Sequence, residues 1–507
     1  MTDQRFHDLD ARTALEQGKP GLVWSRLICD TETPVSAALK LMQPGRGDFL
    51  LESVEGGAVR GRYSLLGIDP DLLFRAFGNC AEINPRWQAD REAFAPVEQG
   101  SIEALRQLVQ QCRLDVPDGL PKALACLVGY FAYETIGLVE KLPRPAHDPL
   151  GLPDMIFARP TVILVFDRLA DQLYLIAPIW PEALASASVD ALIERARERI
   201  DQAAAGLARP LPDATRAPAD LVLPPRQPSM APDAYVDMVG KAKDYIRAGD
   251  IFQVVLAQRF TQPFPLPPFD LYRALRRINP SPFLYHLDLP GFSLIGSSPE
   301  ILVRVRDGEV TIRPIAGTRP RGKTALEDAE NKAELLADPK ERAEHLMLLD
   351  LGRNDVGRVA AAGTVTVTDS YMIEFYSHVM HIVSNVVGRL DPAKDALDAL
   401  FAGFPAGTVS GAPKVRACEI IAELEPETRG PYAGCVGYFS PDGSMDSCIV
   451  LRTALVKDGV MHVQAGAGIV ADSDPQAEQR ECEHKSGALF AAAAEAVRVA
   501  RETGFGQ

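Results

Sequence analysis

The sequence predicts an α+β fold, with large and mainly antiparallel β-sheets packed together and helices on the outside. Strand-like runs arrive in groups rather than alternating strictly with helices, which favours this class over a doubly wound parallel sheet. The chain has 507 residues, of which 47% are hydrophobic, so it can bury a large core. Such a length suits two or three domains or one large interleaved unit. We expect the N- and C-terminal halves to be interleaved.

One segment near the middle of the chain has the composition of a linker. Residues 203–232 are rich in Ala and Pro and show little hydrophobic periodicity, which is typical of a connection rather than an element. This segment divides the chain into an N-terminal region over residues 1–202 and a C-terminal region over residues 233–507.

The N-terminal region mixes short strands with helices. Apolar and β-branched runs predict strands at 49–51, 63–66 and 124–133. The runs at 161–166 and 173–176 are close enough to form a hairpin. Residues 189–204 have the periodicity of an amphipathic helix.

The C-terminal region begins with a helix over residues 233–248, in which Val239, Ala242 and Ile246 share one face. Gly249 follows it as a stop signal. Further helices are expected at 328–337, 340–351, 413–423 and 475–499. Further strands are expected at 251–260, 364–368, 379–387, 432–439, 448–456 and 461–465.

Composition excludes several classes of function. The net charge is −15, so bulk charge does not favour binding to nucleic acid or to an anionic membrane. No apolar run reaches the length of a membrane span, and the polar N-terminus does not resemble a secretory signal. The eight cysteines have no metal-type spacing. They are expected to be reduced, mostly buried thiols of a cytoplasmic protein.

Acidic residues recur with helical spacing in two segments. Glu478, Glu481 and Lys485 follow the helix start SDP at 473–475, and Glu341 and Glu344 share the same three-residue spacing. Each set projects from one helix face. Two acidic faces that meet would form a site for a hard divalent cation. The alternative is two solvated faces with ordinary charge patterning.

Four polar residues lie where the pattern expects apolar or neutral ones. Gln253 occupies a strand position, and Glu300 follows the small-residue turn in GSSPEILV. His381 and Arg452 both alternate with apolar residues, so each points to an apolar strand face. A buried Arg452 needs an anionic partner, which a substrate could supply. For Gln253 an edge position or a hydrogen-bonded core amide explains the pattern about as well as function does. For His381 a hydrogen-bonded core histidine is the more common explanation, and a lone Glu beside Pro such as Glu300 is usually a loop residue.

Three small-residue motifs bear on anion binding or catalysis. GTVSG at 407–411 offers hydroxyl and backbone N–H groups to an anion before a predicted helix. GAGIVA at 466–471 is discounted as a dinucleotide fingerprint, because apolar residues continue before the helix opens. Cys435 in AGCVG is discounted as a nucleophile because it lies inside a predicted strand.

Many blocks of the sequence, in order and with consistent spacing, resemble the chorismate-utilising enzymes, most closely the anthranilate synthase component I family. They include IFQVVLAQRF, NPSPF, SSPEILV, PIAGTRPRG, AEHLMLLDLGRNDVGRV, VMHIVS, GTVSGAPKVRA, YAGCVGYFS, CIVLRTALV and QAGAGIVADSDP. The N-terminal half adds LLES at 50–53 and RYSLLG at 62–67. The resemblance implies a regulatory N-terminal region and a chorismate-binding catalytic domain over 233–507.

The resemblance also implies a metal and a substrate site. Mg²⁺ is expected at Glu344 and Glu481, supported by Glu341 and Glu478, where it would bind the ring carboxylate of chorismate. The residues expected to bind the substrate are Thr408, Tyr432, Arg452, Gly466, Gly468 and Lys485. Arg452 and Lys485 would hold the enolpyruvyl carboxylate.

Three residues carry the chemistry that the resemblance implies. Glu300 is expected to protonate the departing C4 hydroxyl, and His381 to take part in the later elimination of pyruvate. Gln253 stands where water-adding relatives carry Lys, so it indicates ammonia as the nucleophile. Ala316 stands where 4-amino-4-deoxychorismate synthases carry Lys. Alternatives that remain are a synthase that stops at 2-amino-2-deoxyisochorismate, a 4-amino-4-deoxychorismate synthase, and a non-catalytic tryptophan-binding regulator.

The resemblance further implies a partner and an inhibitor. A glutamine amidotransferase subunit, component II, is expected to supply ammonia, because the chain shows no glutaminase-like nucleophile. Tryptophan is expected as a feedback inhibitor at Glu52, Ser53, Pro282, Phe283 and Leu284. The chain departs from the family pattern at Phe283 and Leu284 in the inhibitor motif, and at Cys482 and His484 after Glu481.

Overall fold

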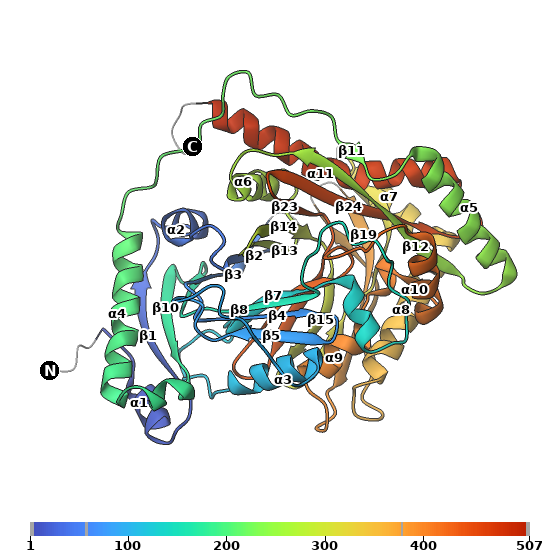
Figure 1. The fold of residues 1–507 in the computed structure, drawn as a ribbon. Helices are drawn as coiled ribbons and strands as arrows, with labels where there is room; N and C mark the ends of the chain where they lie inside the picture. Colours follow the sequence, from blue (N-terminus) through green and yellow to red (C-terminus); the bar gives the residue numbers. More distant parts are fainter. Residues whose placement is uncertain (1–4, 56–58, 377–378, 503–507) are drawn as a thin grey trace.

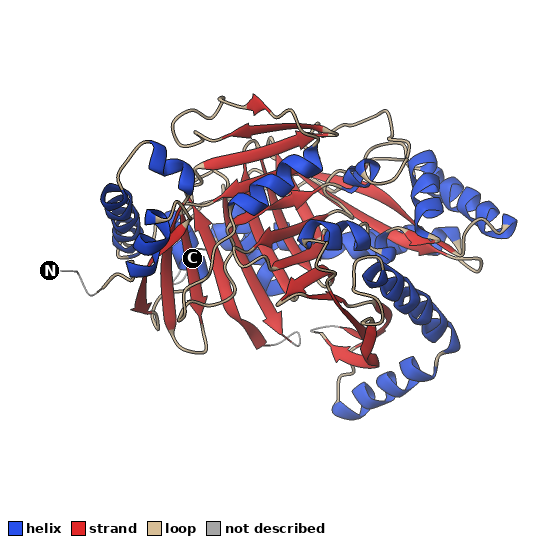
Figure 2. Cartoon of the chain, turned by 90° about the horizontal axis from the view of Figure 1, so that it is seen from below, coloured by secondary structure: helices blue, strands red, loops and turns tan. Residues whose placement is uncertain are grey.

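A computed structural model describes residues 5–55, 59–376 and 379–502 of the chain. Over these residues the named strands form two sheets of 12 strands each. Every pairing between those strands is antiparallel, which confirms the predicted α+β class. Figure 2 shows the strands in the centre of the molecule and the helices on the outside.

The first sheet joins the two halves of the chain. Its strand order is β1 (Gly21–Ile28), β10 (Gln172–Ile179), β9 (Val162–Asp167), β3 (Val59–Ile68), β2 (Asp48–Glu55), β13 (Phe283–Leu289), β14 (Phe292–Ser298), β23 (Thr453–Lys457), β24 (Val460–Ile469), β12 (Gln253–Pro263) and β11 (Gln227–Pro228), with β20 (Gly411–Ala412) beside β12. The junction is the pairing of β2 with β13, in which Glu52 is opposite Leu284. The two predicted inhibitor-site segments therefore lie on neighbouring strands.

The second sheet joins the halves again. Its strand order is β17 (Ile315–Pro320), β19 (Val379–Arg389), β16 (Glu309–Ile312), β15 (Ile301–Arg306), β22 (Met445–Ile449), β21 (Cys435–Phe439), β7 (Leu127–Phe131), β8 (Met155–Arg159), β4 (Leu72–Phe77), β5 (Cys80–Asn84) and β6 (Ala95–Pro96), with β18 (Thr366–Phe375) beside β19. Here β7 pairs with β21. The predicted interleaving of the two halves is confirmed in both sheets.

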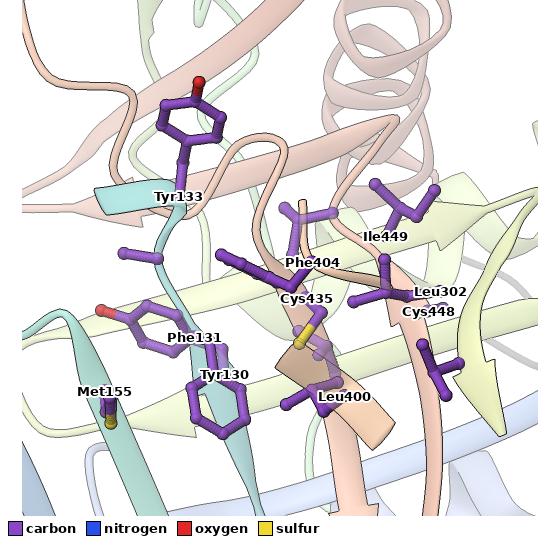
Figure 3. Packing of buried hydrophobic residues seen from close by; sticks show 14 of the residues in the cluster. Tyr130, Phe131, Tyr133, Met155, Leu302, Leu400, Phe404, Cys435, Cys448 and Ile449 are labelled. Atoms are coloured by element: carbon purple, nitrogen blue, oxygen red, sulfur yellow. The ribbon is translucent and has the colours of Figure 1, made fainter. Parts of the chain in front are cut away.

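The main hydrophobic core fills the space between the sheets. The rings of Tyr130 on β7 and Phe292 on β14 meet edge-on with centroids 6.0 Å apart, so side chains from both sheets contact each other directly. Figure 3 shows part of this core around Phe131, Leu400 and Cys435. Its aromatic and aliphatic side chains supply most of the apolar burial that stabilises the arrangement.

A second core lies on the outer face of the first sheet, under helices. The helices that contribute buried residues are α1 (Leu9–Glu16), α2 (Pro34–Leu41), α4 (Val189–Leu207), α6 (Pro268–Ile278) and α11 (Pro475–Arg501). Figure 1 shows α4 along β1 and β10, and α11 beside β24. None of the helices in the described part of the chain is long and apolar enough to span a membrane.

Most predicted elements are present, with shifted ends. The predicted helices correspond to α4, α5 (Pro232–Ala248), α7 (Ala325–Ala337), α8 (Pro339–Gly357), α10 (Lys414–Leu424) and α11. Between α4 and α5 the only regular element within the described residues is the two-residue strand β11. The predicted hairpin of β9 and β10 is confirmed. The division into regions at 202 and 233 stays a prediction.

One predicted strand is wrong in a way that matters for the site. Residues 448–456 do not form a single strand, because β22 belongs to the second sheet and β23 to the first. The chain crosses between the sheets at Arg452, whose φ of 47° lies in the left-handed region. Apolar residues still alternate along 448–456, because the residues before and after the crossing are buried against the core that the two sheets share. Arg452 therefore sits at a sheet-to-sheet crossing and not on a strand face.

Candidate active site

Two capped helices carry the acidic residues predicted to bind metal. Asp338 accepts hydrogen bonds from the backbone N–H groups of Lys340 and Glu341 at the start of α8. Asp474 caps α11 in the same way through the N–H of Ala477. In both cases a proline follows at the first helical position, as is common at helix starts. These caps fix where the acidic first turns begin.

The carboxylates on the two helices are close in space. Burial raises the pKa of Glu344, although a hydrogen bond from Gln253 and the nearby charge of Lys485 lower it. Burial also raises the pKa of Glu478, which feels both Lys485 and Lys340. Because a residue of each helix influences the carboxylates of the other, α8 and α11 present their charged faces to one site.

Two of the four carboxylates already have basic partners. The Oε1 of Glu481 lies 2.7 Å from Lys485 Nζ, and the Oε1 of Glu341 lies 3.1 Å from Arg319 Nη1. Lys485 Nζ also donates to the carbonyl oxygen of Gly466 at 3.0 Å. Protein cations therefore offset part of the negative charge.

The donor set fits a hard cation. Within the described residues no group of three or more His, Cys, Asp or Glu side chains is already arranged around one point. Even so, the oxygens on facing helices are the ligand type that Mg²⁺ prefers. A carboxylate such as Glu344, whose burial disfavours its own charge, is stabilised by a cation beside it. Glu344 and Glu481 remain the predicted ligands.

Gln253 lies at the start of β12 and faces this acidic site. Its Nε2 donates to Oε1 of Glu344 at 3.3 Å. A Cβ added to Gly468 on the paired strand would lie 2.6 Å from the same Nε2, so any larger residue there would make the Gln253 amide shift. Gln253, Glu344 and Gly468, all predicted site residues, thus lie next to one another.

Glu300 is buried, between the two sheets, just before β15. The hydroxyl of Thr408 donates to its Oε1 at 3.2 Å. Burial raises the pKa of Glu300 to about 8, against a smaller lowering by the Thr408 hydrogen bond. The side chain is therefore protonated at neutral pH, which is the state that a general acid needs.

His381 on β19 has a defined protonation state. Its Nδ1 lies 3.0 Å from the carbonyl oxygen of Gly317 and 3.1 Å from Thr318 Oγ1. A carbonyl oxygen only accepts, so Nδ1 carries the hydrogen. Burial lowers the pKa of His381 to about 4, which leaves the ring neutral and Nε2 with a free lone pair. This ring can act as a base.

Arg452, Tyr432 and Gly466 form the remaining part of the site. Over the described residues no carboxylate pairs with the guanidinium of Arg452, whose pKa is lowered by burial. A Cβ on Gly466 would lie 2.8 Å from the hydroxyl oxygen of Tyr432. Tyr432 precedes β21 rather than lying in it, which corrects the predicted strand over 432–439. The guanidinium of Arg452, without a carboxylate partner among the described residues, and the backbone at Gly466, which carries no side chain, suit an anionic ligand.

The five predicted inhibitor residues line one cavity of about 880 Å³ between the sheets. The carboxylate of Glu52 is held there by three neighbours. Tyr272 Oη donates to it at 2.6 Å, Arg276 approaches both oxygens at 2.9 and 3.0 Å, and Arg168 lies at 2.9 Å. Glu52 thus ties β2 to α6 as well as lining the cavity.

Residues that sequence reasoning missed are Arg319, Gly317 and Tyr376. Gly317 has φ of 72°, and its carbonyl fixes the tautomer of His381. The glycine in PIAGT was a signal for such a backbone turn, whereas nothing in the sequence marked Tyr376. Cys435 is buried and its pKa is raised well above the usual value, in line with its dismissal as a nucleophile. Cys482 is buried, and its Sγ lies 3.1 Å from Tyr235 Oη.

Proteins of known function match most of the chain. The profile of the chorismate-binding enzymes matches residues 60–491. Anthranilate synthase component 1 of Cereibacter sphaeroides is 52% identical over 490 residues, which cover 96% of this chain and 97% of that protein. Component 1 of Thermus thermophilus is 47% identical over 467 residues, with 92% and 96% covered.

Solved structures match as well. Anthranilate synthase component I of Streptococcus pneumoniae superimposes with a TM-score of 0.74 at 38% identity, over 85% of this chain and 92% of that one. The menaquinone-specific isochorismate synthase of Escherichia coli has the same fold, with a TM-score of 0.70 at 21% identity. The chain therefore belongs to the chorismate-binding enzyme family, within its anthranilate synthase component 1 branch.

Proposed function

We propose that the protein is the large subunit of an anthranilate synthase, which converts chorismate and ammonia to anthranilate and pyruvate as the first step of tryptophan biosynthesis. The observation that carries the proposal is Glu300, buried beside Thr408, where burial raises its pKa to about 8. A carboxylic acid kept neutral by burial has a clear use in protonating a poor leaving group. The anthranilate synthase relatives support this assignment.

The two carboxylates of chorismate would be held at opposite ends of the site. Arg452, which lacks a protein counter-ion among the described residues, and Lys485 suit the enolpyruvyl carboxylate. Glu344 and Glu481 would hold Mg²⁺, with Glu341 and Glu478 in support. When bound, the cation supplies positive charge for the ring carboxylate. With the cation bound at Glu481, Lys485 would no longer be needed as its ion-pair partner. Lys485 would then be able to bind the substrate carboxylate.

The first step replaces the C4 hydroxyl by an amine at C2. Glu300 donates its proton to the hydroxyl, which leaves as water while the ring double bond shifts and ammonia forms a bond to C2. The ammonium group formed at C2 then releases one proton to solvent, which leaves the amine. Ammonia needs no activating base, and Gln253 offers an amide rather than the ammonium group of a lysine. The product of this step is 2-amino-2-deoxyisochorismate.

The second step removes the C2 proton. The free Nε2 of His381 takes it, the C–H electrons complete the aromatic ring, and the C3–O bond breaks. The departing enolpyruvate gains a proton and becomes pyruvate. The neutral state of His381, held by Gly317, supports this role. Ala316 on β17 offers no amine for the covalent chemistry of a 4-amino-4-deoxychorismate synthase.

The proposal includes component II as an ammonia-supplying partner and tryptophan as an inhibitor at the cavity that contains Glu52 and Ser53. The assay that tests the function uses the purified chain with chorismate, Mg²⁺ and ammonium at alkaline pH, followed by anthranilate fluorescence and by chromatography of all products. Anthranilate is expected. Release of only the amino intermediate, of the 4-amino isomer, or of no product would contradict the proposal.

A further inference from the structure

The large cavity shares walls with the candidate active site. The same cavity that contains the predicted inhibitor residues is also lined by Pro299, Ile301 and Tyr376. Two of these residues flank Glu300 in the sequence, and the third contacts His381. A ligand in the cavity therefore lies directly behind the proposed acid and the proposed base.

The wall next to Glu300 is firmly held. The carbonyl oxygen of Glu300 accepts a hydrogen bond from the N–H of Ile449 at 3.0 Å, and Ser298 Oγ donates to the carbonyl of Ile449 at 2.6 Å. Pro299 and Ile301 face the cavity, while the Glu300 carboxyl meets Thr408. With these backbone bonds in place, the wall offers little movement to a ligand.

The wall next to His381 depends on one side chain. The rings of Tyr376 and His381 meet edge-on, with centroids 5.2 Å apart and an interplanar angle of 71°. The Tyr376 hydroxyl donates to Oε2 of Glu374 at 3.2 Å, and Glu374 forms an ion pair with Arg313. Glu374 and Arg313 also line the cavity. A ligand in the cavity can thus contact Tyr376, Glu374 and Arg313.

The imidazole of His381 has two restraints of different kinds. The hydrogen bond from Nδ1 to Gly317 fixes one edge of the ring, whereas contact with Tyr376 limits rotation about that bond. Without the second restraint, Nε2 can swing away from the substrate while the first remains. Small displacements of a catalytic group are costly, since about 1 Å can lower a rate by about 10²-fold.

We propose that Tyr376 is a positioning residue that holds His381 for the elimination step and transmits the occupancy of the cavity to that step. The inference rests on the proposed function. A ligand that moves the Tyr376 ring, or breaks its link to Glu374 and Arg313, favours the state in which His381 is misaligned. Addition of ammonia uses Glu300 and continues, so the amino intermediate is released in place of anthranilate.

The test measures the ratio of released intermediate to anthranilate with the full chain, chorismate, Mg²⁺ and ammonium. Tyr376→Leu removes the ring edge, and we expect the ratio to rise by about 10-fold, part of the roughly 10²–10⁴-fold contribution of a general base. Tyr376→Phe keeps the ring but loses the hydrogen bond to Glu374, so it should raise the ratio by less than Tyr376→Leu does. Tyr63→Leu, which alters the same cavity away from His381, is the matched control.

L-Tryptophan is the probe for transmission. Saturating tryptophan should raise the ratio in the unchanged chain, but should not raise it further in Tyr376→Leu even though calorimetry still detects binding. Should Tyr376→Leu not fold, Glu374→Gln loosens the same ring and is expected to raise the ratio.

The outcomes separate this inference from the proposed function. If the unchanged chain makes no anthranilate, the function itself is wrong. If it makes anthranilate but the folded variants keep its product ratio, Tyr376 does not position His381. If bound tryptophan does not change the ratio in the unchanged chain, the cavity does not transmit its occupancy to the elimination step.

Discussion

Thr408 donates its hydroxyl hydrogen to Oε1 of Glu300 across 3.2 Å, inside the space between the two sheets. This bond stabilises the charged carboxylate, but burial has the larger effect and raises the pKa of Glu300 to about 8. The pair thus contains an acid that keeps its proton at neutral pH. Glu300 lies between the sheets and is not one of the proposed metal ligands, so proton donation and metal binding are assigned to different residues.

Glu300→Gln should lower the turnover rate by about 10²–10⁴-fold, because the amide has no acidic proton to donate. In the unchanged chain, activity at constant free ammonia should fall as pH rises through about 8, where the acid form is lost. Thr408→Val removes the bond that favours the anion, so this alkaline limb should move to higher pH. An unchanged rate for Glu300→Gln would remove Glu300 from the mechanism.

The same substitution should change stability in a pH-dependent way. The folded protein holds the Glu300 proton up to about pH 8, whereas the unfolded chain releases it near 4.5. The contribution of this group to stability is therefore full below about 4.5 and is lost as pH rises through 8. Glu300→Gln does not titrate, so it should gain stability relative to the unchanged chain over that window, on the order of a few kcal/mol. Thermal melts at both ends of the window measure the difference.

Glu344→Gln and Glu481→Gln should each abolish Mg²⁺-dependent turnover while the thermal midpoint stays similar. Each change removes one hard anionic ligand but keeps the side-chain shape. Glu483→Gln, on α11 but hydrogen-bonded to Gln479, is the control and should keep the normal Mg²⁺ response. Normal Mg²⁺ dependence in either test variant would identify these residues as ordinary surface charges.

Gly468→Ala should lower turnover with ammonia by up to about 10²-fold, because the new Cβ would lie 2.6 Å from Gln253 Nε2 and displace it. Gly487→Ala, in α11 with open space around it, should leave activity intact and add up to about 1 kcal/mol of stability. Steady-state kinetics and thermal melts of both variants provide the comparison. Equal activity of the two would show that Gln253 tolerates displacement.

The purified chain should use free ammonia and not glutamine. Burial raises the pKa of Cys112, Cys435 and Cys482, so these thiols are poor nucleophiles at neutral pH. Glutamine-dependent anthranilate formation should appear only after a component II protein is added. Glutamine use by the chain alone would be incompatible with a separate amidotransferase.

Tryptophan should bind the cavity and reduce chorismate affinity by about 1–3 kcal/mol through reciprocal linkage. Calorimetric titration with and without chorismate measures the coupling. Ser53→Ala should weaken tryptophan binding by about 1 kcal/mol, as expected for the loss of one hydrogen bond, without a change in uninhibited turnover. Absence of binding, or binding without an effect on chorismate, would argue against this regulation.

The sequence was sufficient for the fold class. The family resemblance assigned Glu52 and Leu284 to one site, and they lie opposite each other on β2 and β13, whereas the hydrogen bond between Gln253 and Glu344 was not predicted. The continuous strand predicted through Arg452 was wrong, because apolar alternation cannot distinguish one long strand from two strands that enter different sheets around a shared core. Tyr376 could not be found either. Its contact with His381 depends on how the chain returns after β18, and residues 377–378 lie outside the described part.

Both sheets depend on pairings between strands that are distant along the chain. β2 ends at Glu55 and its partner β13 begins at Phe283, so about 230 residues separate them. At roughly 5–20 residues per second, the edge of β2 waits about 10–50 s for its neighbour during synthesis. An unpaired edge is a template for association with other chains. Aggregation of this enzyme should therefore depend on translation speed and on chaperones that cover nascent strands.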